Sequence, residues 1–553
     1  MKISLTDVNN GDIYEVEKGT SFYELKQEFE KHYNKKVYGV KINNNIKELF
    51  KKVEHSGNIK FLDLSDPDGV RIYRRGILFL IYMALKDINP NDKFYVNNSI
   101  GPGLYCEFDS GIPSQEYLDK IVERMKELVK KNLVFEKLTK DKQYVINLFK
   151  QDNQEDKANL FKYRKKSTVN FYKANGYFNY FYGYMPYSTG ELEKFEIKKI
   201  ENGFVMISPN ESSPDKIPEY KHFAKLSATF NEYNEWLKIM DIRTVGDLNE
   251  LIVGGKHNVC ELIRISEALH EKKYSQIADE FIKRKNSKLL LIAGPSSSGK
   301  TTSAKRIAIQ LKVNGLRPVQ ISLDDYFVDR SLTPRDENGN YDFESIFSLD
   351  LDLLNKTMKD LIEGKEVEIP KFNFINGKRE WIGKKLKIEK DQPIIIEGIH
   401  GLNETLTSDI PRDQKFKVYV SALTQMNLDS VNRIPTTDTR IIRRIVRDFN
   451  SRGHNALDTL KMWASVRRGE ERNIFPYQEE ADIMFNSHLV YELSVLKLFA
   501  EPLLLNICAD NEEYPEAKRL LRFLDYFMPI TELEEIPRTS VIREFIGRSS
   551  FDY

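Results

Sequence analysis

This sequence has few cysteines, and its basic and acidic residues almost balance. Its 553 residues include 3 cysteines, Cys106, Cys260 and Cys508, and their wide separation fits neither a metal site nor a disulfide framework. We therefore expect three buried thiols in a reducing compartment. Lys and Arg total 84 against 83 Asp and Glu, a net charge of +1, so no global basic excess favours nucleic acid as a partner.

The sequence also lacks a long apolar run. Residues 1–16 carry scattered charges and no apolar core of the kind found in a signal peptide. The longest apolar stretch, Gly76 to Leu85, is flanked by Arg75 and Lys86. It is too short to span a bilayer and is predicted to be a buried helix. These absences predict a cytoplasmic protein without a membrane partner.

The chain is too long for one core, and its patterns divide it into four parts. Residues 1–62 begin with a hairpin around Asn9-Asn10-Gly11, continue with an amphipathic helix at 21–33 and end in short strands, which predicts a β-grasp domain. Residues 63–218 mix strands and helices and predict an α+β domain that ends in a polar, proline-containing linker at 208–218. Residues 219–285 are predicted to be a helical connector, with Thr244 as the cap of one of its helices.

Residues 286–553 have a different texture. Short apolar runs at 289–294, 318–323, 393–398 and 416–422 are separated by helical patterns. Continuous apolar strands that alternate with helices are typical of a parallel sheet covered on both faces. This part is therefore predicted to be an α/β domain.

The strongest chemical signal lies between the first of these strands and the helix that follows it. Gly294-Pro-Ser-Ser-Ser-Gly299-Lys300-Thr301 fits the pattern of a loop that wraps phosphates with its backbone N–H groups. Lys300 is expected to reach the β- and γ-phosphates of ATP, and the Thr301 hydroxyl to bind Mg²⁺. The predicted phosphate-binding residues here are Gly294, Ser296, Ser297, Ser298, Gly299, Lys300, Thr301 and Thr302.

Two further strands end in carboxylates. Because the carboxyl ends of parallel strands meet at one edge of a sheet, these groups should lie beside the phosphate loop. Asp324, in Ser322-Leu-Asp-Asp-Tyr326, is predicted to accept the proton of an attacking hydroxyl; the alternative is that Asp324 or Asp325 caps a helix. Glu397 ends the run 393–397 and is predicted to hold Mg²⁺ directly or through water.

A cluster of arginines follows in the segment 438–448. Arg440, Arg443 or Arg444, and Arg447 recur at helical spacing and share one face. Four guanidinium groups repel one another unless an anion lies among them. A solvated basic face is the alternative, but we predict a lid helix that closes over the transferring phosphoryl group.

With these residues in place, the C-terminal half resembles the uridine kinase and phosphoribulokinase family from about Lys288 to Asn486. The similar segments are GPSSSGKTT, SLDDYF, 341–350, 363–374, IIIEGIHGL at 394–402 and 438–453. The resemblance implies a P-loop kinase fold that uses ATP and Mg²⁺. It implies that Asp324, Lys300 and Arg440 are catalytic, that Glu397 and Thr301 hold the metal, and that Arg440, Arg443 and Arg447 bind phosphate.

The resemblance also implies an acceptor site. Glu344 matches the acidic residue that grips the ribose hydroxyls, with Asp342 as a near competitor, and Tyr326 and Asp324 belong to the same predicted set. Uridine kinases place a Tyr and then a His in the base pocket, where this sequence has Phe372 and Gly377. Phe372 can still stack on a base, whereas glycine offers no side-chain hydrogen bond. The segment 397–403 also resembles phosphoribulokinases.

The N-terminal half resembles the front end of threonyl-tRNA synthetases. Residues 1–62 are similar to their TGS domain, and 61–80 and 100–109 to the start of their editing domain. That domain uses two histidines on one helix, and the matching positions here hold Arg75 and Phe79. The resemblance therefore implies that editing has been lost and that this half is a structural, dimerising or ligand-sensing module.

The sequence therefore predicts a kinase that transfers the γ-phosphate of Mg-ATP to the 5′-hydroxyl of a nucleoside. A sugar or sugar-phosphate kinase and an RNA-associated regulatory NTPase are the alternatives. The absence of a long basic stripe in residues 1–225 argues against the RNA-associated NTPase. The sequence does not settle which nucleobase the acceptor carries or what the N-terminal half does. The oligomeric state is also open, and a homo-oligomer is one of the possibilities.

Overall fold

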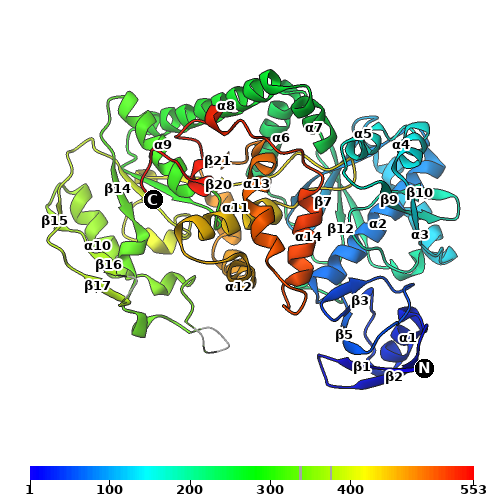
Figure 1. Ribbon diagram of the computed structural model, residues 1–553. Helices are drawn as coiled ribbons and strands as arrows, with labels where there is room; N and C mark the ends of the chain where they lie inside the picture. Colours follow the sequence, from blue (N-terminus) through cyan, green and yellow to red (C-terminus); the bar gives the residue numbers. More distant parts are fainter. Residues whose placement is uncertain (336–338, 340, 374–375) are drawn as a thin grey trace.

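The structure is a computed structural model that describes residues 1–335, 339, 341–373 and 376–553 (Figure 1). The segment 363–374 that resembles the kinase family therefore ends outside the described residues. No helix among the described residues is long and apolar enough to cross a bilayer. Cys106 and Cys260 are buried as predicted, whereas Cys508 is exposed, so the prediction of three buried thiols is wrong at that position.

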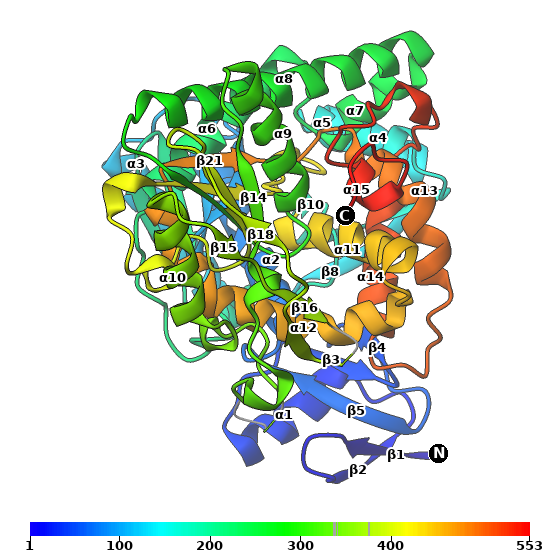
Figure 2. The same cartoon turned by 90° about the vertical axis from the view of Figure 1, so that its left-hand side faces the viewer.

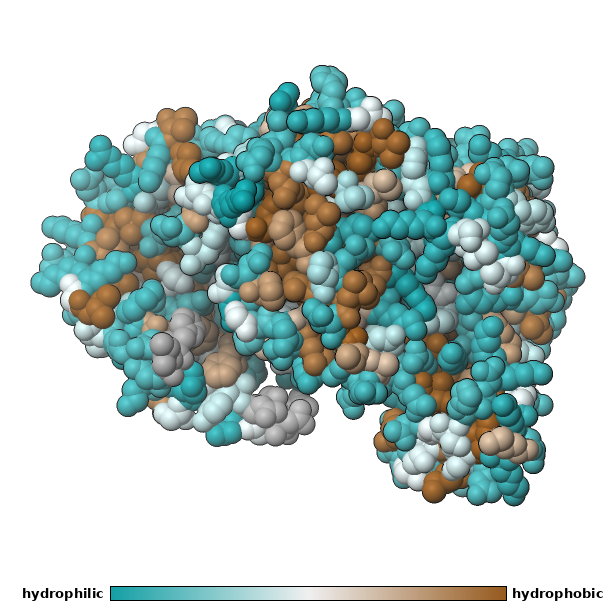
Figure 3. Space-filling view, viewed as in Figure 1, coloured by the Kyte–Doolittle hydropathy of each residue, from teal (hydrophilic) through white to brown (hydrophobic). Residues whose placement is uncertain are grey.

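The N-terminal residues form a five-stranded sheet with the order β2-β1-β5-β3-β4 and one helix, α1, packed on it. The predicted hairpin is present as β1 paired with β2, and Ser21 caps α1 through a reciprocal capping box with Glu24. In the space-filling view this sheet forms a lobe that projects from the lower right of the molecule (Figure 3). The elements are β1 (Lys2–Asp7), β2 (Ile13–Glu17), α1 (Phe22–Tyr33), β3 (Gly39–Ile42), β4 (Asn45–Lys47) and β5 (Gly57–Leu62).

Next along the chain, helix α2 (Pro67–Ile88) lies among two antiparallel sheets. Asp66 caps its first turn, and the apolar stretch Gly76 to Leu85 is buried as predicted. The sheets have the orders β11-β12-β7-β6 and β10-β9-β8. Their strands and helices are β6 (Phe94–Ile100), β7 (Gly103–Phe108), α3 (Gln115–Lys131), β8 (Glu136–Asp141), α4 (Lys142–Gln151), α5 (Glu155–Lys162), β9 (Thr168–Ala174), β10 (Tyr177–Asn179), β11 (Glu196–Ile200) and β12 (Gly203–Ile207).

Three helices then lead to the C-terminal half: α6 (Ala224–Ile239), α7 (Val245–Val253) and α8 (Lys256–Lys283). Thr244 caps α7 with Asp247, which confirms the predicted helix start. The long helix α8 runs along the top of the molecule above α9 (Figure 1). Glu267 of α8 faces Arg306 of α9 at 3.4 Å, so the two helices are joined by charge as well as by apolar packing.

The C-terminal sheet is parallel throughout and has the order β14-β19-β13-β20-β21. The four predicted strands are present, and the structure adds β21 at one edge. All residues of the central strand β13 are buried, which explains its unbroken apolar run. The elements are β13 (Leu289–Ala293), α9 (Lys300–Val313), β14 (Val319–Ser322), α10 (Leu351–Ile362), β15 (Val367–Glu368), β16 (Lys371–Asn373), β17 (Lys378–Glu380), β18 (Lys385–Leu386), β19 (Ile394–Glu397), β20 (Lys415–Ser421) and β21 (Ile483–Asn486).

The remaining helices lie between this sheet and the N-terminal half (Figures 1 and 2). They are α11 (Thr436–Ser451), α12 (Ala456–Asn473), α13 (Glu492–Leu505), α14 (Tyr514–Leu524) and α15 (Arg543–Ile546). One hydrophobic core contains Leu160 of α5, Leu248 of α7, Ile445 of α11, Leu496 of α13 and Phe523 of α14. The two halves of the chain therefore share a core and are not merely tethered.

Candidate active site at the phosphate loop

The loop between β13 and α9 has the strained backbone that its glycines and serines permit. Ser297 and Gly299 both have positive φ angles, 59° and 83°. A β-carbon at Gly294 would collide with the carbonyl oxygen of Val420, and one at Gly299 with Val541. Helix α9 begins at Lys300, so the loop wraps the N-terminus of a helix, where backbone N–H groups favour phosphate.

Thr301 and Glu397, the two predicted metal ligands, lie together. The register pairs Ile292 of β13 with Glu397 of β19, which brings the carboxylate to the start of the loop. The Thr301 hydroxyl donates to Glu397 Oε1 at 3.2 Å. A hydroxyl and a carboxylate fit Mg²⁺ that is completed by phosphate oxygens and water. No cluster of three or more His, Cys, Asp or Glu suited to a metal occurs among the described residues, and such a shared site needs none.

Lys300 is the cation of this group. Its ammonium donates to the carbonyl oxygen of Pro295 at 3.2 Å. Burial lowers the pKa of Lys300, and the neighbouring Glu397 opposes this change. Burial raises the pKa of Glu397, which Lys300 opposes and Asp324 increases. These mutual effects show that the lysine and the two carboxylates share one small region.

The adjacent residues Asp324 and Asp325 have different surroundings. Asp325 accepts the backbone N–H of Phe372 at 3.3 Å and the ammonium of Lys371 at 3.1 Å, so it anchors β16. The cap of this turn is Ser322, whose hydroxyl accepts the Asp324 N–H at 3.3 Å. The Asp324 side chain is left exposed at the strand ends. Loss of water around its carboxyl nevertheless raises its pKa, and Lys300 opposes this.

The residues predicted to bind the acceptor lie in different surroundings in the structure. Glu344 is half-buried and packs against Gly469 of α12, and burial and the nearby Glu470 raise its pKa. Asp342 instead accepts the N–H of Glu344 at 3.2 Å, which gives it a turn-forming contact. Tyr326 is fully buried in the core under α10. The structure therefore corrects the prediction for Tyr326, because the turn after β14 directs this side chain into the core.

Phe372 and Gly377 belong to the hairpin β16–β17. Phe372 is 7% exposed, and its ring centroid lies 5.6 Å from that of Phe327. Gly377 has a φ of 69°, and a β-carbon there would come within 3.0 Å of Arg330. A histidine would be both strained and crowded at this position. Glycine is thus required by the turn itself.

The arginines of α11 are already paired, which differs from the predicted lid. Arg440 and Arg443 are buried, with 1% and 0% exposure, and form ion pairs with Glu470 and Glu492. Arg440 donates to the carbonyl oxygen of Ser296 at 2.9 Å, and Arg443 to that of Ser297 at 3.3 Å. They hold the loop through its backbone. The anions that the sequence argument required are carboxylates of α12 and α13.

Arg444 and Arg447 form the outer part of this face. Arg444 donates to the Ser296 hydroxyl at 2.8 Å and to Asp448 at 3.1 Å, and Arg447 donates to Asp448 at 2.9 Å. Helix α11 buries its apolar face in the core shared by both halves. It is consequently a fixed wall beside the loop, with Arg447 as its least buried predicted phosphate ligand.

Sequence reasoning missed the segment 541–553, which returns to the loop from the far end of the chain. The Thr302 hydroxyl donates to Glu544 at 2.6 Å and lies 3.0 Å from the Tyr553 hydroxyl. Lys305 faces the Phe551 and Tyr553 rings at 5.9 Å and 5.5 Å. Figure 1 shows this end of the chain below α9. No local motif marks these residues; the only signal is two aromatic residues near a chain terminus.

A parallel sheet, a phosphate loop on its central strand and carboxylates at the neighbouring strand ends define a P-loop kinase fold. The sequence profile of the phosphoribulokinase / uridine kinase family matches residues 289–494. The uridine kinase of Staphylococcus haemolyticus is 30% identical over 200 residues, which cover 36% of this chain and 87% of that protein. The chain belongs to the phosphoribulokinase / uridine kinase family.

Another relative matches a different share of the chain. The threonine–tRNA ligase of Clostridium novyi is 28% identical over 206 residues, which are 37% of this chain. The chain spans only 32% of the length of that ligase. Together with the kinase match, this supports the predicted fusion. Among solved structures, one described as a possible uridine kinase from Bacillus stearothermophilus is 19% identical, with a TM-score of 0.25 over 36% of this chain and 88% of that one.

Proposed function

We propose that this protein is an ATP-dependent nucleoside kinase that phosphorylates the 5′-hydroxyl of its acceptor. The observation that carries the proposal is the contact between Thr301 and Glu397, with Lys300 and Asp324 beside it. This set supplies a metal position, a phosphate cation and a carboxylate at the edge where ligands of parallel sheets bind.

The roles follow from charge and position. Lys300 and the loop N–H groups hold the β- and γ-phosphates, and Thr301 and Glu397 would hold Mg²⁺, which neutralises phosphate charge. The acceptor oxygen bonds to the γ-phosphorus while the bond to the β,γ-bridging oxygen breaks. The hydroxyl proton passes to Asp324, and ADP leaves. Arg440 and Arg443 keep the loop in shape, and Arg447 is the arginine we place nearest the transferred group.

The acceptor site lies between Asp324, Glu344 and the hairpin β16–β17. We place the ribose hydroxyls on Glu344, whose carboxylate lies near Lys300 and Arg444. The base would lie on Phe372. A second candidate, a sugar-phosphate acceptor, is favoured by Arg330, whose backbone N–H donates to Gly377 at 2.8 Å and whose side chain lies against this glycine. A cation at that position suits a phosphate better than a base edge.

We also propose domains at 1–62, 63–218, 219–285 and 286–553, the first TGS-like and the second a degenerate editing-type domain. For the second domain, Phe79 supports the loss of editing. Its side chain is fully buried, and its ring centroid lies 5.4 Å from that of Phe135 and 5.3 Å from that of Phe181. A packed phenyl ring offers neither a proton acceptor nor a metal ligand.

The test is an acceptor panel with the full-length chain. Mg-ATP is supplied with ribonucleosides, 2′-deoxyribonucleosides, sugars or sugar phosphates, and ADP release is measured. We expect release that depends on a ribonucleoside and is lost with EDTA or in Lys300→Ala. Release that depends only on a sugar phosphate would select the second candidate. Release without any acceptor would instead indicate a regulatory NTPase.

A further inference from the structure

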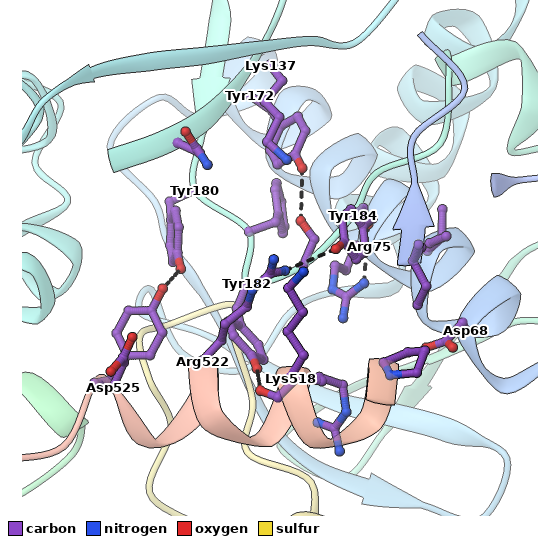
Figure 4. A pocket seen from close by; sticks show the side chains of 18 of the residues that line it. Asp68, Arg75, Lys137, Tyr172, Tyr180, Tyr182, Tyr184, Lys518, Arg522 and Asp525 are labelled. Atoms are coloured by element: carbon purple, nitrogen blue, oxygen red, sulfur yellow. Dashed lines mark hydrogen bonds between the residues drawn. The ribbon is translucent and has the colours of Figure 1, made fainter. Parts of the chain in front are cut away.

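A cavity apart from the phosphate loop lies where both halves of the chain meet. Its walls come from the β3–β4 turn, helix α2, the segment 180–184 and helix α14 (Figure 4). None of the loop residues 294–302 lines it. Its volume is about 250 Å³, whereas a water needs only about 10–15 Å³ by the same kind of measure. The cavity therefore has room for an organic molecule.

The lining carries an excess of positive charge. Seven lining residues are Lys or Arg and two, Asp68 and Asp525, are acidic. Three of the cations have carboxylate partners: Lys137 lies 2.9 Å from Glu48, Lys166 lies 3.9 Å from Asp525, and Arg519 lies 2.8 Å from Asp438. The other four cations lack a carboxylate within ion-pair distance among the described residues.

These four are Arg75, Arg164, Lys518 and Arg522, and the contacts they do make are neutral. Arg75 donates to the carbonyl oxygen of Tyr184 at 3.2 Å, Arg522 to the Tyr184 hydroxyl at 3.0 Å, and Lys518 to Asn45 at 3.0 Å. Arg164 has two buried nitrogens, Nε and one terminal nitrogen, with no acceptor in the described part of the chain. A buried guanidinium without an acceptor costs free energy unless an anion completes it.

The pKa shifts of these cations differ: burial lowers the pKa of Arg522 but its tyrosine neighbours, chiefly Tyr184, raise it more, so its net shift is upward, whereas those of Lys518 and Arg75 are lowered. Burial lowers the pKa of Lys518, and the like charges of Arg522 and Lys47 lower it further. Burial likewise lowers the pKa of Arg75, and Arg71 adds to the effect. A bound anion would relieve both penalties. The neighbouring Arg519 is paired with Asp438 and Glu516, whereas no described residue places a carboxylate within ion-pair distance of Lys518 or Arg522.

The other wall is aromatic. Tyr172, Tyr180, Tyr182, Tyr184 and Tyr526 all line the cavity. The hydroxyls of Tyr180 and Tyr526 form a hydrogen bond with each other, and the Tyr182 hydroxyl donates one to the carbonyl oxygen of Arg519. Figure 4 shows Tyr184 beside Arg75 and Tyr182 beside Arg522 and Lys518 of α14. Half-buried tyrosine rings beside unpaired cations suit a flat ring that carries an anionic group.

We propose that this cavity binds a free mononucleotide, with its phosphate on Lys518, Arg522 and Arg75 and its base against Tyr182 and Tyr184. Arg75 would then have a binding role at the position where the editing resemblance expects a histidine. The choice of a nucleoside monophosphate as the ligand rests on the proposed function, because that reaction produces one. The site itself does not depend on that reaction.

The experiment is calorimetric titration of the full-length chain with uridine 5′-monophosphate and adenosine 5′-monophosphate. It is run in the Lys300→Ala background, which weakens phosphate binding at the loop, and needs no turnover. We expect binding of at least one mononucleotide to persist there. It should weaken at least tenfold when Lys518→Gln and Arg522→Gln are added. Uridine and inorganic phosphate should bind at least tenfold more weakly than the mononucleotide.

Lys120→Gln is the matched control, because Lys120 is an exposed cation on α3, 2.7 Å from Glu116 and outside the cavity. Melting curves confirm that the variants are folded, and Tyr184→Ala gives a second variant that removes ring contact without removing charge. Three results would overturn the proposal: unchanged binding in Lys518→Gln/Arg522→Gln, complete loss in Lys300→Ala alone, or equal affinity for inorganic phosphate. Binding of a short RNA more than tenfold tighter than the mononucleotide would overturn its assignment to a free ligand.

Discussion

Asp324 and Asp325 are adjacent and chemically identical, but their different contacts give them different roles. Asp325 is held by Lys371 and by the backbone of Phe372. Asp324 faces the region of Lys300 and Glu397. The sequence predicted Asp324 as the base, with capping of a helix by Asp324 or Asp325 as the alternative, since both follow a strand that ends at the ligand edge. The two side chains differ only because the backbone turns after β14 and directs them to different surroundings.

Asp324→Asn should lower kcat by roughly 10²–10⁴ while the Kd for ATP stays nearly unchanged, because the carboxylate handles only the acceptor proton. Turnover and ATP binding are measured separately. Asp325→Asn is the matched neighbour and should act mainly on the acceptor KM, through β16. A near-normal kcat in Asp324→Asn would remove this residue from the role of base.

The same residue fixes the acid limb of the pH profile. Loss of water raises the pKa of Asp324 above the ordinary value of an aspartate, and a base must be deprotonated to act. Activity should therefore fall, as pH is lowered, at a higher pH than for an ordinary aspartate. The readout is kcat/KM against pH. In Asp324→Asn the remaining activity should lack this limb, and an unchanged limb would assign it to another group, such as Glu344.

The acceptor residues allow a separate prediction. Glu344→Ala should reduce kcat/KM for ribonucleosides more than for 2′-deoxyribonucleosides, because it removes the partner of the ribose hydroxyls. Phe372→Ala should raise the nucleoside KM far more than the ATP KM, since base stacking contributes about 1–3 kcal/mol in comparable sites. Steady-state kinetics with both substrates decide this. If only a sugar phosphate is accepted and Phe372→Ala has no effect, the nucleoside assignment fails.

At the scale of elements, sequence reasoning succeeded where the determinants are local. The strand-loop-helix of the phosphate loop, the N-terminal hairpin and the start of α7 all depend on residues within a few positions of each other. The role of α11 was misjudged because its partners are distant. Glu470 and Glu492 lie on α12 and α13, and no spacing rule connects them to Arg440 and Arg443.

The segment 541–553 gives the element-scale prediction. Glu544 places a carboxylate on the Thr302 hydroxyl and near Lys300, where ATP phosphates are expected. Two like charges about 4 Å apart cost ~1 kcal/mol even in bulk water, so Glu544→Gln should lower the ATP Kd about fivefold. Direct ATP titration measures it. Glu534→Gln, an exposed carboxylate 3.0 Å from Arg548, is the control. Weaker ATP binding in Glu544→Gln would show that the carboxylate supports the site.

For the whole molecule, the shared core is the feature that no part of the sequence could reveal. Side chains from α4, α5 and α7 pack with those from α11, α13 and α14, although the first group precedes the phosphate loop and the second follows it. Asp438 at the start of α11 is bound by Arg519 of α14, which also lines the cationic cavity. The synthetase-like half therefore shares a hydrophobic core with the helix that holds the phosphate loop.

The final prediction concerns what that half no longer does. The full-length chain should hydrolyse seryl-tRNA no faster than buffer, because Arg75 and Phe79 occupy the two positions where the editing resemblance expects histidines. Arg75 lines a cationic cavity and Phe79 is packed among aromatic rings, so neither can activate water. Release of labelled serine is measured, with Lys120→Gln and Arg75→Ala alongside. Hydrolysis above background in the unaltered chain that disappears in Arg75→Ala but persists in Lys120→Gln would show that a different editing chemistry survives there.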